Sequence, residues 1–132
     1  MAICFPLSVE LQSYNFPDHY IGLTGSAAYI RRQAQPVQWE LVTPGLCGLP
    51  GTASFRLSAD PNVYLRHRGF LLYADPFQES TLFRQDSCFY LWKNKWFPGH
   101  EAFESVNFRG RFIRHQGYRL KLHPYKSVVF VS

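Results

Sequence analysis

The stretch FESVNFRGRFIRHQGYRLKL, residues 103–122, decides the fold prediction. Two short apolar segments flank a turn at Arg109-Gly110, and the second segment leads into the basic pair Arg114-His115. Beyond Gly117, apolar and basic residues alternate as far as Leu122. Alternation of this kind is typical of a strand with one buried face. The stretch therefore predicts two short strands that present one histidine, followed directly by a third strand.

A similar stretch occurs 48 positions earlier in the chain. Phe55–Ala74 reads FRLSADPNVYLRHRGFLLYA, and the shift places Arg66-His67 on Arg114-His115. A weaker copy, LQSYNFPDHYIGLTG at Leu11–Gly25, has Leu23 at the position of the histidine. Three copies at a period near 40–48 residues indicate an internal repeat.

Three strings within these copies carry a resemblance to a known family. They are FESVNFRGRFIRH at residues 103–115, YLRHRGF at 64–70 and FRQDSCF at 83–89. From about Val9 to the end, the chain resembles the arabinofuranose-binding module found beside α-L-arabinofuranosidases. The resemblance implies a β-trefoil of three repeats that binds arabinofuranose side chains of plant polysaccharides.

Length and composition agree with one small all-β domain. A chain of 132 residues can bury a single core, and its scattered glycines and prolines suit many short strands joined by turns. No stretch keeps a helical period over several turns, so the sequence predicts an all-β sandwich or barrel. The repeat selects the β-trefoil, a single domain over residues 1–132 with four-stranded repeats at about 9–45, 52–94 and 102–132. The predicted core residues are Leu11, Tyr20, Leu41, Phe55, Leu65, Phe83, Phe103, Ile113 and Phe130.

The third repeat stops before the counterpart of Asp86–Trp92, which predicts an open sheet edge. Two sources could supply the missing strand. One is Ala2–Leu7, in which Ile3-Cys4-Phe5 resembles Ser87-Cys88-Phe89, and the other is a second chain. We therefore expect a monomer closed by its own N-terminus or a strand-exchanged dimer.

The net charge of +5, with histidine neutral, is spread along the chain without a block of five or six like charges. This pattern indicates a soluble surface more than an anionic partner, although sulfated glycan, anionic lipid and nucleic acid are the partners that a positive charge favours. No apolar run approaches membrane-spanning length. We expect no nucleic acid partner and no membrane insertion.

The three cysteines, Cys4, Cys47 and Cys88, cannot all pair within the chain and lack metal-ligand spacing. They predict free thiols in a reducing compartment. The N-terminal Met1–Leu7 has no basic segment and is interrupted by Pro6, so it does not read as a signal peptide. The expected localisation is cytoplasmic, or secreted if the chain is a piece of a larger protein.

The resemblance also implies a binding pocket in the second repeat. In the family, each working pocket uses the histidine of the Arg-His pair and an aspartate about one strand pair later, which fall here on His67 and Asp86. A carboxylate accepts sugar hydroxyl hydrogens strongly, and imidazole can donate or accept one. An aromatic side chain, Phe70 or Tyr73, would cover the C–H side of the sugar, and Asp75 completes the expected set. The alternatives are an interior histidine bonded to a backbone carbonyl and a turn or cap carboxylate.

A weaker second pocket is predicted at His115, Tyr118 and His123, because the third repeat ends before the aspartate. The first repeat lacks the histidine and should not bind. No cofactor and no metal site are expected.

Catalysis is not expected, because glycoside hydrolysis needs a facing pair of carboxylates and none of the common catalytic motifs is present. Two functions remain. The first is a non-catalytic carbohydrate-binding module for an L-arabinofuranose-type glycan. The second is an intracellular β-trefoil protein-interaction domain that has lost sugar binding.

Overall fold

The computed structural model describes residues 7–9, 11–13, 16–32, 37–93, 101–124 and 130–131. None of the helices in these ranges is long and apolar enough to cross a membrane. The elements are β1 (Leu7–Val9), β2 (Gln12–Ser13), β3 (His19–Thr24), β4 (Ala27–Arg32), β5 (Trp39–Val42), β6 (Thr52–Leu57), β7 (Val63–Arg68), β8 (Leu71–Pro76), α1 (Thr81–Asp86), β9 (Phe89–Lys93), β10 (Glu101–Ser105), β11 (Phe112–Gln116), β12 (Arg119–His123) and β13 (Phe130–Val131).

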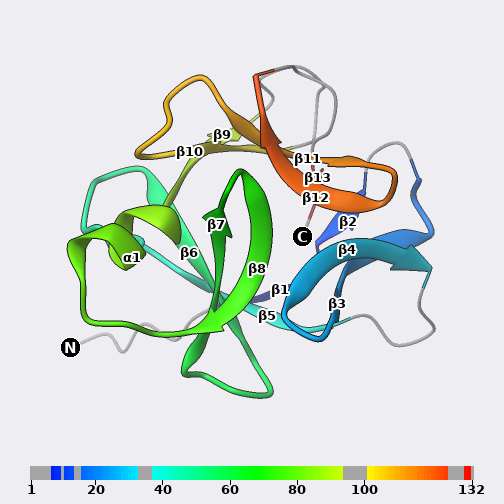
Figure 1. Ribbon diagram of the computed structural model, residues 1–132, viewed down its shortest axis with the longest axis horizontal. Helices are drawn as coiled ribbons and strands as arrows, with labels where there is room; N and C mark the ends of the chain where they lie inside the picture. The colour runs from blue at the N-terminus through cyan, green and yellow to red at the C-terminus, as the bar shows by residue number, and fades with distance from the viewer. Residues whose placement is uncertain are drawn as a thin grey trace.

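The strands form one antiparallel sheet that closes on itself (Figure 1). The order is β1-β5-β6-β7-β8-β12-β11-β10-β13-β2-β3-β4, and β4 returns to pair with β8 and β12. Strand β9 lies off this path and pairs with β10 and β6. The return of β4 to β8 and β12 gives backbone partners to strands that would otherwise lie at an edge of the sheet. The predicted all-β class is confirmed.

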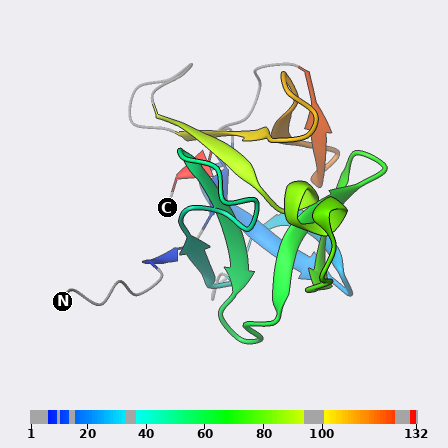
Figure 2. The same ribbon diagram turned by 90° about the vertical axis from the view of Figure 1, so that its left-hand side faces the viewer.

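The prediction of a β-trefoil of three four-stranded repeats is wrong, because the strands make one closed antiparallel barrel. The three copies do not contribute equal units, so the predicted internal repeat is not supported either. The second copy contains the helix α1 at Thr81–Asp86, although the sequence predicted no helix there. The hydroxyl of Ser80 caps this helix by accepting a hydrogen bond from the Phe83 amide at 3.0 Å. The helix packs beside β7 (Figure 2).

The predicted closure by Ala2–Leu7 can be compared with the structure only at Leu7. Ala2–Pro6 lies outside the described residues, but Leu7 belongs to β1 and pairs with Leu41 of β5. Among the described residues, β1 pairs with β5 and with none of the C-terminal strands. Instead β13 pairs with β10 on one side and with β2 of the same chain on the other.

The core agrees with most of the predicted residues. Six of them are buried, whereas Tyr20 and Leu41 are only partly buried and the side chain of Phe130 lies outside the described set. The centre also contains Trp39, which is fully buried, and an edge-on contact between Phe55 and Phe103 with ring centroids 5.0 Å apart. The six buried residues are Leu11, Phe55, Leu65, Phe83, Phe103 and Ile113.

The prediction of free thiols is wrong for two of the three cysteines. Cys47 and Cys88 form a disulfide across a sequence separation of 41 residues. The loop that carries Cys47 approaches so closely that a Cβ atom on Gly45 would lie 2.5 Å from the Cys88 sulfur. The bond therefore ties this loop to the segment that follows α1, and Cys4 lies outside the described residues.

Candidate functional site

A strained aromatic residue stands at the tip of the β7–β8 hairpin. Gly69 and Phe70 both have positive φ, 58° and 61°, as a two-residue turn matched to the twist of a hairpin requires. Glycine adopts this conformation freely, but a bulky residue there costs about 1–3 kcal/mol. The Phe70 side chain is nevertheless 38% exposed. A strained residue that keeps its ring in solvent points to a functional role for that ring.

A second exposed ring lies beside it. Phe108, in the turn after β10, is 42% exposed and meets Phe70 edge-on with centroids 5.1 Å apart. The same Phe108 ring lies 5.3 Å from the imidazole of His67, again edge-on. Two exposed aromatic rings therefore adjoin a buried histidine.

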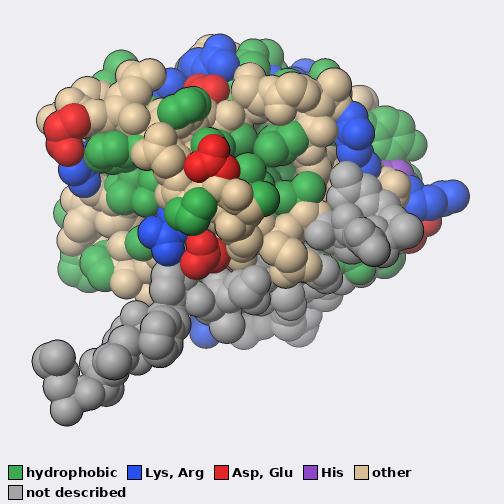
Figure 3. Space-filling view, turned by 90° about the horizontal axis from the view of Figure 1, so that it is seen from below, with side chains coloured by type: hydrophobic (Ala, Val, Ile, Leu, Met, Phe, Trp, Pro, Cys, Tyr) green, Lys and Arg blue, Asp and Glu red, His purple; other side chains and the backbone are tan. Residues whose placement is uncertain are grey.

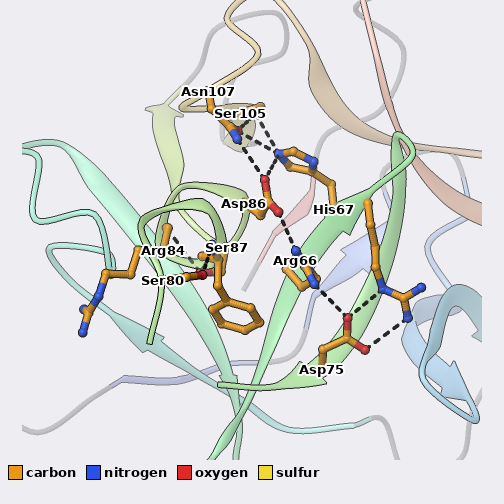
Figure 4. A network of polar contacts seen from close by, with 11 residues as sticks. Arg66, His67, Asp75, Ser80, Arg84, Asp86, Ser87, Ser105 and Asn107 are labelled. Carbon is orange, nitrogen blue, oxygen red and sulfur yellow. Dashed lines mark hydrogen bonds and ion pairs between the residues drawn. The ribbon is translucent and has the colours of Figure 1, made fainter. Parts of the chain in front are cut away.

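The histidine belongs to a polar cluster that joins three parts of the chain (Figure 4). His67 of β7 has Nε2 2.8 Å from Oδ1 of Asn107, in the turn after β10. The Asn107 amide nitrogen donates to Oδ1 of Asp86, the last residue of α1, at 2.9 Å. The other oxygen of Asp86 accepts a hydrogen bond from Arg66 at 2.5 Å. Because the amide oxygen of Asn107 can only accept, Nε2 of His67 carries the proton.

Burial controls the charge of the histidine. Loss of solvent lowers the pKa of His67, and the hydrogen bond to Asn107 and the negative charge of Asp86 oppose this only in part. The imidazole is therefore neutral at pH 7. Arg66 supplies the positive charge of the cluster instead, and it reaches Asp75 as well, with Nη1 3.4 Å from Oδ2.

The structure brings together three of the predicted pocket residues. Nε2 of His67 lies 3.5 Å from Oδ1 of Asp86, and Phe70 joins them through Phe108. His67 bonds a side-chain amide and not a backbone carbonyl. Both polar residues are nearly enclosed, at 2% and 4% exposed, so the surface of this site is formed by the two rings.

Tyr73 and Asp75 are in a different place from the predicted pocket. Asp75 accepts from Nε of Arg68 at 2.8 Å, and the Arg68 guanidinium covers the Tyr73 ring at 3.6 Å from its centroid. Arg66 stands opposite Tyr73 in the hairpin, and neighbouring residues of a strand face opposite sides, so His67 points away from Tyr73. Burial raises the pKa of Asp75, but the hydrogen bonds and charges of Arg68 and Arg66 outweigh it and hold the pKa below its usual value.

A second aromatic cluster surrounds His115. The turn Gly117-Tyr118 also has two positive φ angles, 57° and 66°, and its tyrosine stacks on His19 at 5.5 Å. The exposed ring of Phe16 lies 5.5 Å from His115 and 5.7 Å from Tyr118. Burial lowers the pKa of His115 to about 4, and the charges of Arg114 and His19 add to the shift.

His123, predicted for this pocket, does not belong to the cluster. It stands opposite Phe112 at the far end of the β11–β12 hairpin from Tyr118, with Nδ1 3.3 Å from Nη1 of Arg114. Sequence reasoning in turn missed Phe108, Asn107 and Phe16. The strings SYNF and SVNF, at residues 13–16 and 105–108, hold a signal that could have found them.

The hollows of the surface lie elsewhere. Hydrophobic side chains gather on the face seen from below (Figure 3). A hollow of about 570 Å³ is lined, among the described residues, by Leu23, Val37, Gln38, Leu57, Ser58 and Ala59. These lining residues include neither an aromatic ring nor a charged group, which are groups that recognise a sugar. The ring-bordered cluster at His67 is therefore the better candidate.

Exposed rings over a buried polar cluster, on a small closed barrel, define a carbohydrate-binding module. The family model of the alpha-L-arabinofuranosidase B (ABFB) domain matches residues 9–130. The chain therefore belongs to this family of carbohydrate-binding domains. No curated protein sequence matches the chain.

Solved structures share the fold. A GH54 α-L-arabinofuranosidase soaked with 4-nitrophenyl α-L-arabinofuranoside matches with a TM-score of 0.80 and 20% identity, over 92% of this chain and 27% of that one. An arabinofuranosidase complexed with arabinofuranosyl-alpha-1,2-xylobiose matches with the same values. A mosquitocidal holotoxin matches with a TM-score of 0.74 and 7% identity, over 97% of this chain and 17% of that one. The chain thus spans about a quarter of the length of the arabinofuranosidases that it matches.

Proposed function

We propose that this domain binds L-arabinofuranosyl side chains of a polysaccharide at the surface formed by Phe70 and Phe108 above His67 and Asp86. The observation that carries the proposal is the exposed, strained ring of Phe70, which packs on Phe108 next to the buried cluster. Family membership supports the ligand class, and the two similar arabinofuranosidases carry ligands of that class.

The site offers both kinds of contact that a furanose requires. The rings present an apolar surface to the C–H side of the sugar. Each oxygen of the Asp86 carboxylate accepts one of the hydrogen bonds described above, from Asn107 and from Arg66, and a carboxylate has about four acceptor positions. A hydroxyl at the edge of the rings donates to a remaining position. Asn107 and Arg66 hold the carboxylate in place for this contact.

Binding proceeds without hydrolysis in this proposal. A glycosidase needs one carboxyl with a raised pKa as general acid, facing a second across the scissile bond. Asp86 of the site and Asp75 do not face each other as a free pair, because both bind Arg66. The pKa of Asp75 is lowered, which is the opposite of what a general acid needs.

The disulfide supports a location outside the reducing cytoplasm. Disulfides such as Cys47–Cys88 persist mainly in oxidising compartments, and plant polysaccharides are also found outside the cytoplasm. We propose the secreted alternative, and the cytoplasmic localisation stays an untested prediction.

Calorimetric titration with an arabinofuranosyl xylo-oligosaccharide tests the function. Phe108→Ala removes one of the two rings and should weaken binding about two- to tenfold, since an aromatic contact contributes roughly 0.5–1.5 kcal/mol. Phe16→Ala is the matched control, because it removes the corresponding exposed ring at His115. Circular dichroism checks that both variants fold.

Wild-type protein that binds no such oligosaccharide would overturn the proposal and favour the protein-interaction alternative. Equal affinity of wild type and Phe108→Ala would show that the sugar does not bind beside His67. It would not contradict the proposed class of ligand.

A further inference from the structure

The acidic side chains of the described residues are mostly neutralised by arginine. Six of them form ion pairs at distances of 2.5 to 3.4 Å. The pairs are Asp18–Arg32, Glu40–Arg56, Asp75 with Arg66 and Arg68, Asp86–Arg66, Glu79–Arg84 and Glu104–Arg109. The net charge of +5 must therefore reside on other cations.

Three of these other cations gather on the β11–β12 hairpin, and we call Arg111, Arg114 and Lys121 the cationic group. Within the described part of the chain, none of the three forms an ion pair with a carboxylate. Arg114 and Lys121 stand directly opposite each other and so share one face of the hairpin. Like charges in this position destabilise a sheet. Among the described residues, no carboxylate pairs with either of these two cations to offset the repulsion.

The three cations lie around one small region near His123. Loss of solvent lowers the pKa of His123, and the positive charges of Arg114, Arg111 and Lys121 lower it further. The imidazole is therefore neutral at pH 7, which lets its Nδ1 accept the contact from Nη1 of Arg114 at 3.3 Å. The charges that act on the imidazole include those of all three cations, so they add a positive potential at this position.

The cationic group is continuous with the aromatic surface. The Arg111 guanidinium lies 4.1 Å from the centroid of the Phe70 ring. The amide of Leu122, next to Lys121, donates to the carbonyl of Phe70 at 2.8 Å. A guanidinium stacked on a ring keeps its in-plane N–H groups available for a carboxylate.

We propose that the cationic group binds the carboxylate of a uronic acid residue carried by the same polysaccharide. The preferred ligand is then an acidic glycan with arabinofuranosyl side chains. This inference rests on the proposed function, because Phe70 and Phe108 place the arabinofuranosyl unit beside Arg111. Three cations suit one or two carboxylates, whereas stable nucleic acid binding uses about 6–10 phosphate contacts.

Two matched xylo-oligosaccharides test the inference, one with an arabinofuranosyl substituent only and one with an additional glucuronosyl substituent. At low salt, wild-type protein should bind the acidic compound about fivefold tighter, the upper range for an exposed ion pair. The preference should vanish near about 1 M salt, where charges are screened beyond about 3 Å.

The double variant Arg114→Gln/Lys121→Gln should lose the preference but bind the neutral compound like wild type. The control is Arg31→Gln/Lys93→Gln, which removes the same charge from exposed positions on β4 and β9. It should keep the preference. A single-stranded DNA oligonucleotide serves as an unrelated polyanion.

The outcomes separate the two proposals. Equal affinity of wild type for both oligosaccharides overturns the uronate site and leaves arabinofuranosyl binding intact. If both double variants lose the preference alike, the uronate site is overturned in favour of non-specific attraction. The same follows if DNA competes as well as the acidic compound. If wild type binds only the acidic compound, the result supports the uronate site but overturns the arabinofuranosyl site. If wild type binds neither oligosaccharide, both proposals are overturned.

Discussion

Two hairpin tips of this molecule look alike but are supported differently. Each presents an aromatic residue with positive φ after a glycine, Phe70 and Tyr118, close to a buried histidine. At His67 the support is Asp86, delivered by α1 and held by Asn107 and Arg66. The hairpin alone therefore provides a ring and a histidine. The segment packed against the hairpin decides whether a carboxylate lies next to that histidine.

The corresponding support at His115 comes from the region before β3. Phe16 and His19 pack there against Tyr118, and Asp18 accepts from His19 at 2.8 Å and pairs with Arg32 at 2.8 Å. Asp18 is an exposed residue, whereas Asp86 is enclosed. We expect the two clusters to differ in stability, in response to pH and in sugar binding.

The largest difference is expected from removing the two aspartates. Asp86→Ala leaves buried Arg66 without its closest partner and should lower the free energy of unfolding by about 3 kcal/mol or more. Asp18→Ala breaks an exposed pair and should cost less than about 1 kcal/mol. Denaturant unfolding of both variants measures the contrast, and similar losses would contradict it. Binding of the arabinofuranosyl oligosaccharide should disappear only in Asp86→Ala.

The pH dependence of stability should come more from His115 than from His67. The pKa of His115 falls from an ordinary 6.5 to about 4 on folding, so the unfolded state binds more protons between these values. The contribution is present above about pH 6.5 and is lost as the pH falls toward 4, by roughly 1–3 kcal/mol. At His67, Asn107 and Asp86 oppose the effect of burial.

The check is the unfolding free energy measured between pH 7 and pH 4. His115→Gln should flatten the acid-side decline more than His67→Gln does. The same slope in wild type and His115→Gln would show that this imidazole does not titrate as the structure implies.

The smallest expected effect on stability follows from replacing the strained rings. Phe70→Gly relieves a positive φ that costs about 1–3 kcal/mol but loses the contact with Phe108, so the melting temperature should stay the same or rise slightly. Tyr118→Gly should behave alike. Only Phe70→Gly should weaken binding of the arabinofuranosyl oligosaccharide, by about two- to tenfold. A large fall in melting temperature would instead show that Phe70 is a structural residue.

The sequence by itself determined the class of the fold and part of the site. Alternation in residues 103–122 predicted the hairpin of β11 and β12, and its buried Leu120 and Leu122, because a strand with one buried face must repeat every two residues. The family resemblance placed His67 with Asp86, and the structure puts them 3.5 Å apart. The first result depends on a local pattern of alternation, and the second depends on a motif within one copy of the repeated stretch.

Only the tertiary structure decided which segments meet. A period of two residues indicates which face of a strand is buried, but not which strand lies next to it. The route from β10 through β13 to β2, the Cys47–Cys88 bond and the approach of Phe108 to His67 all join parts that are distant in sequence. Such contacts form because closing the barrel brings strands that are distant in sequence next to each other. The same closure puts Phe16 over His115 and Arg111 over Phe70.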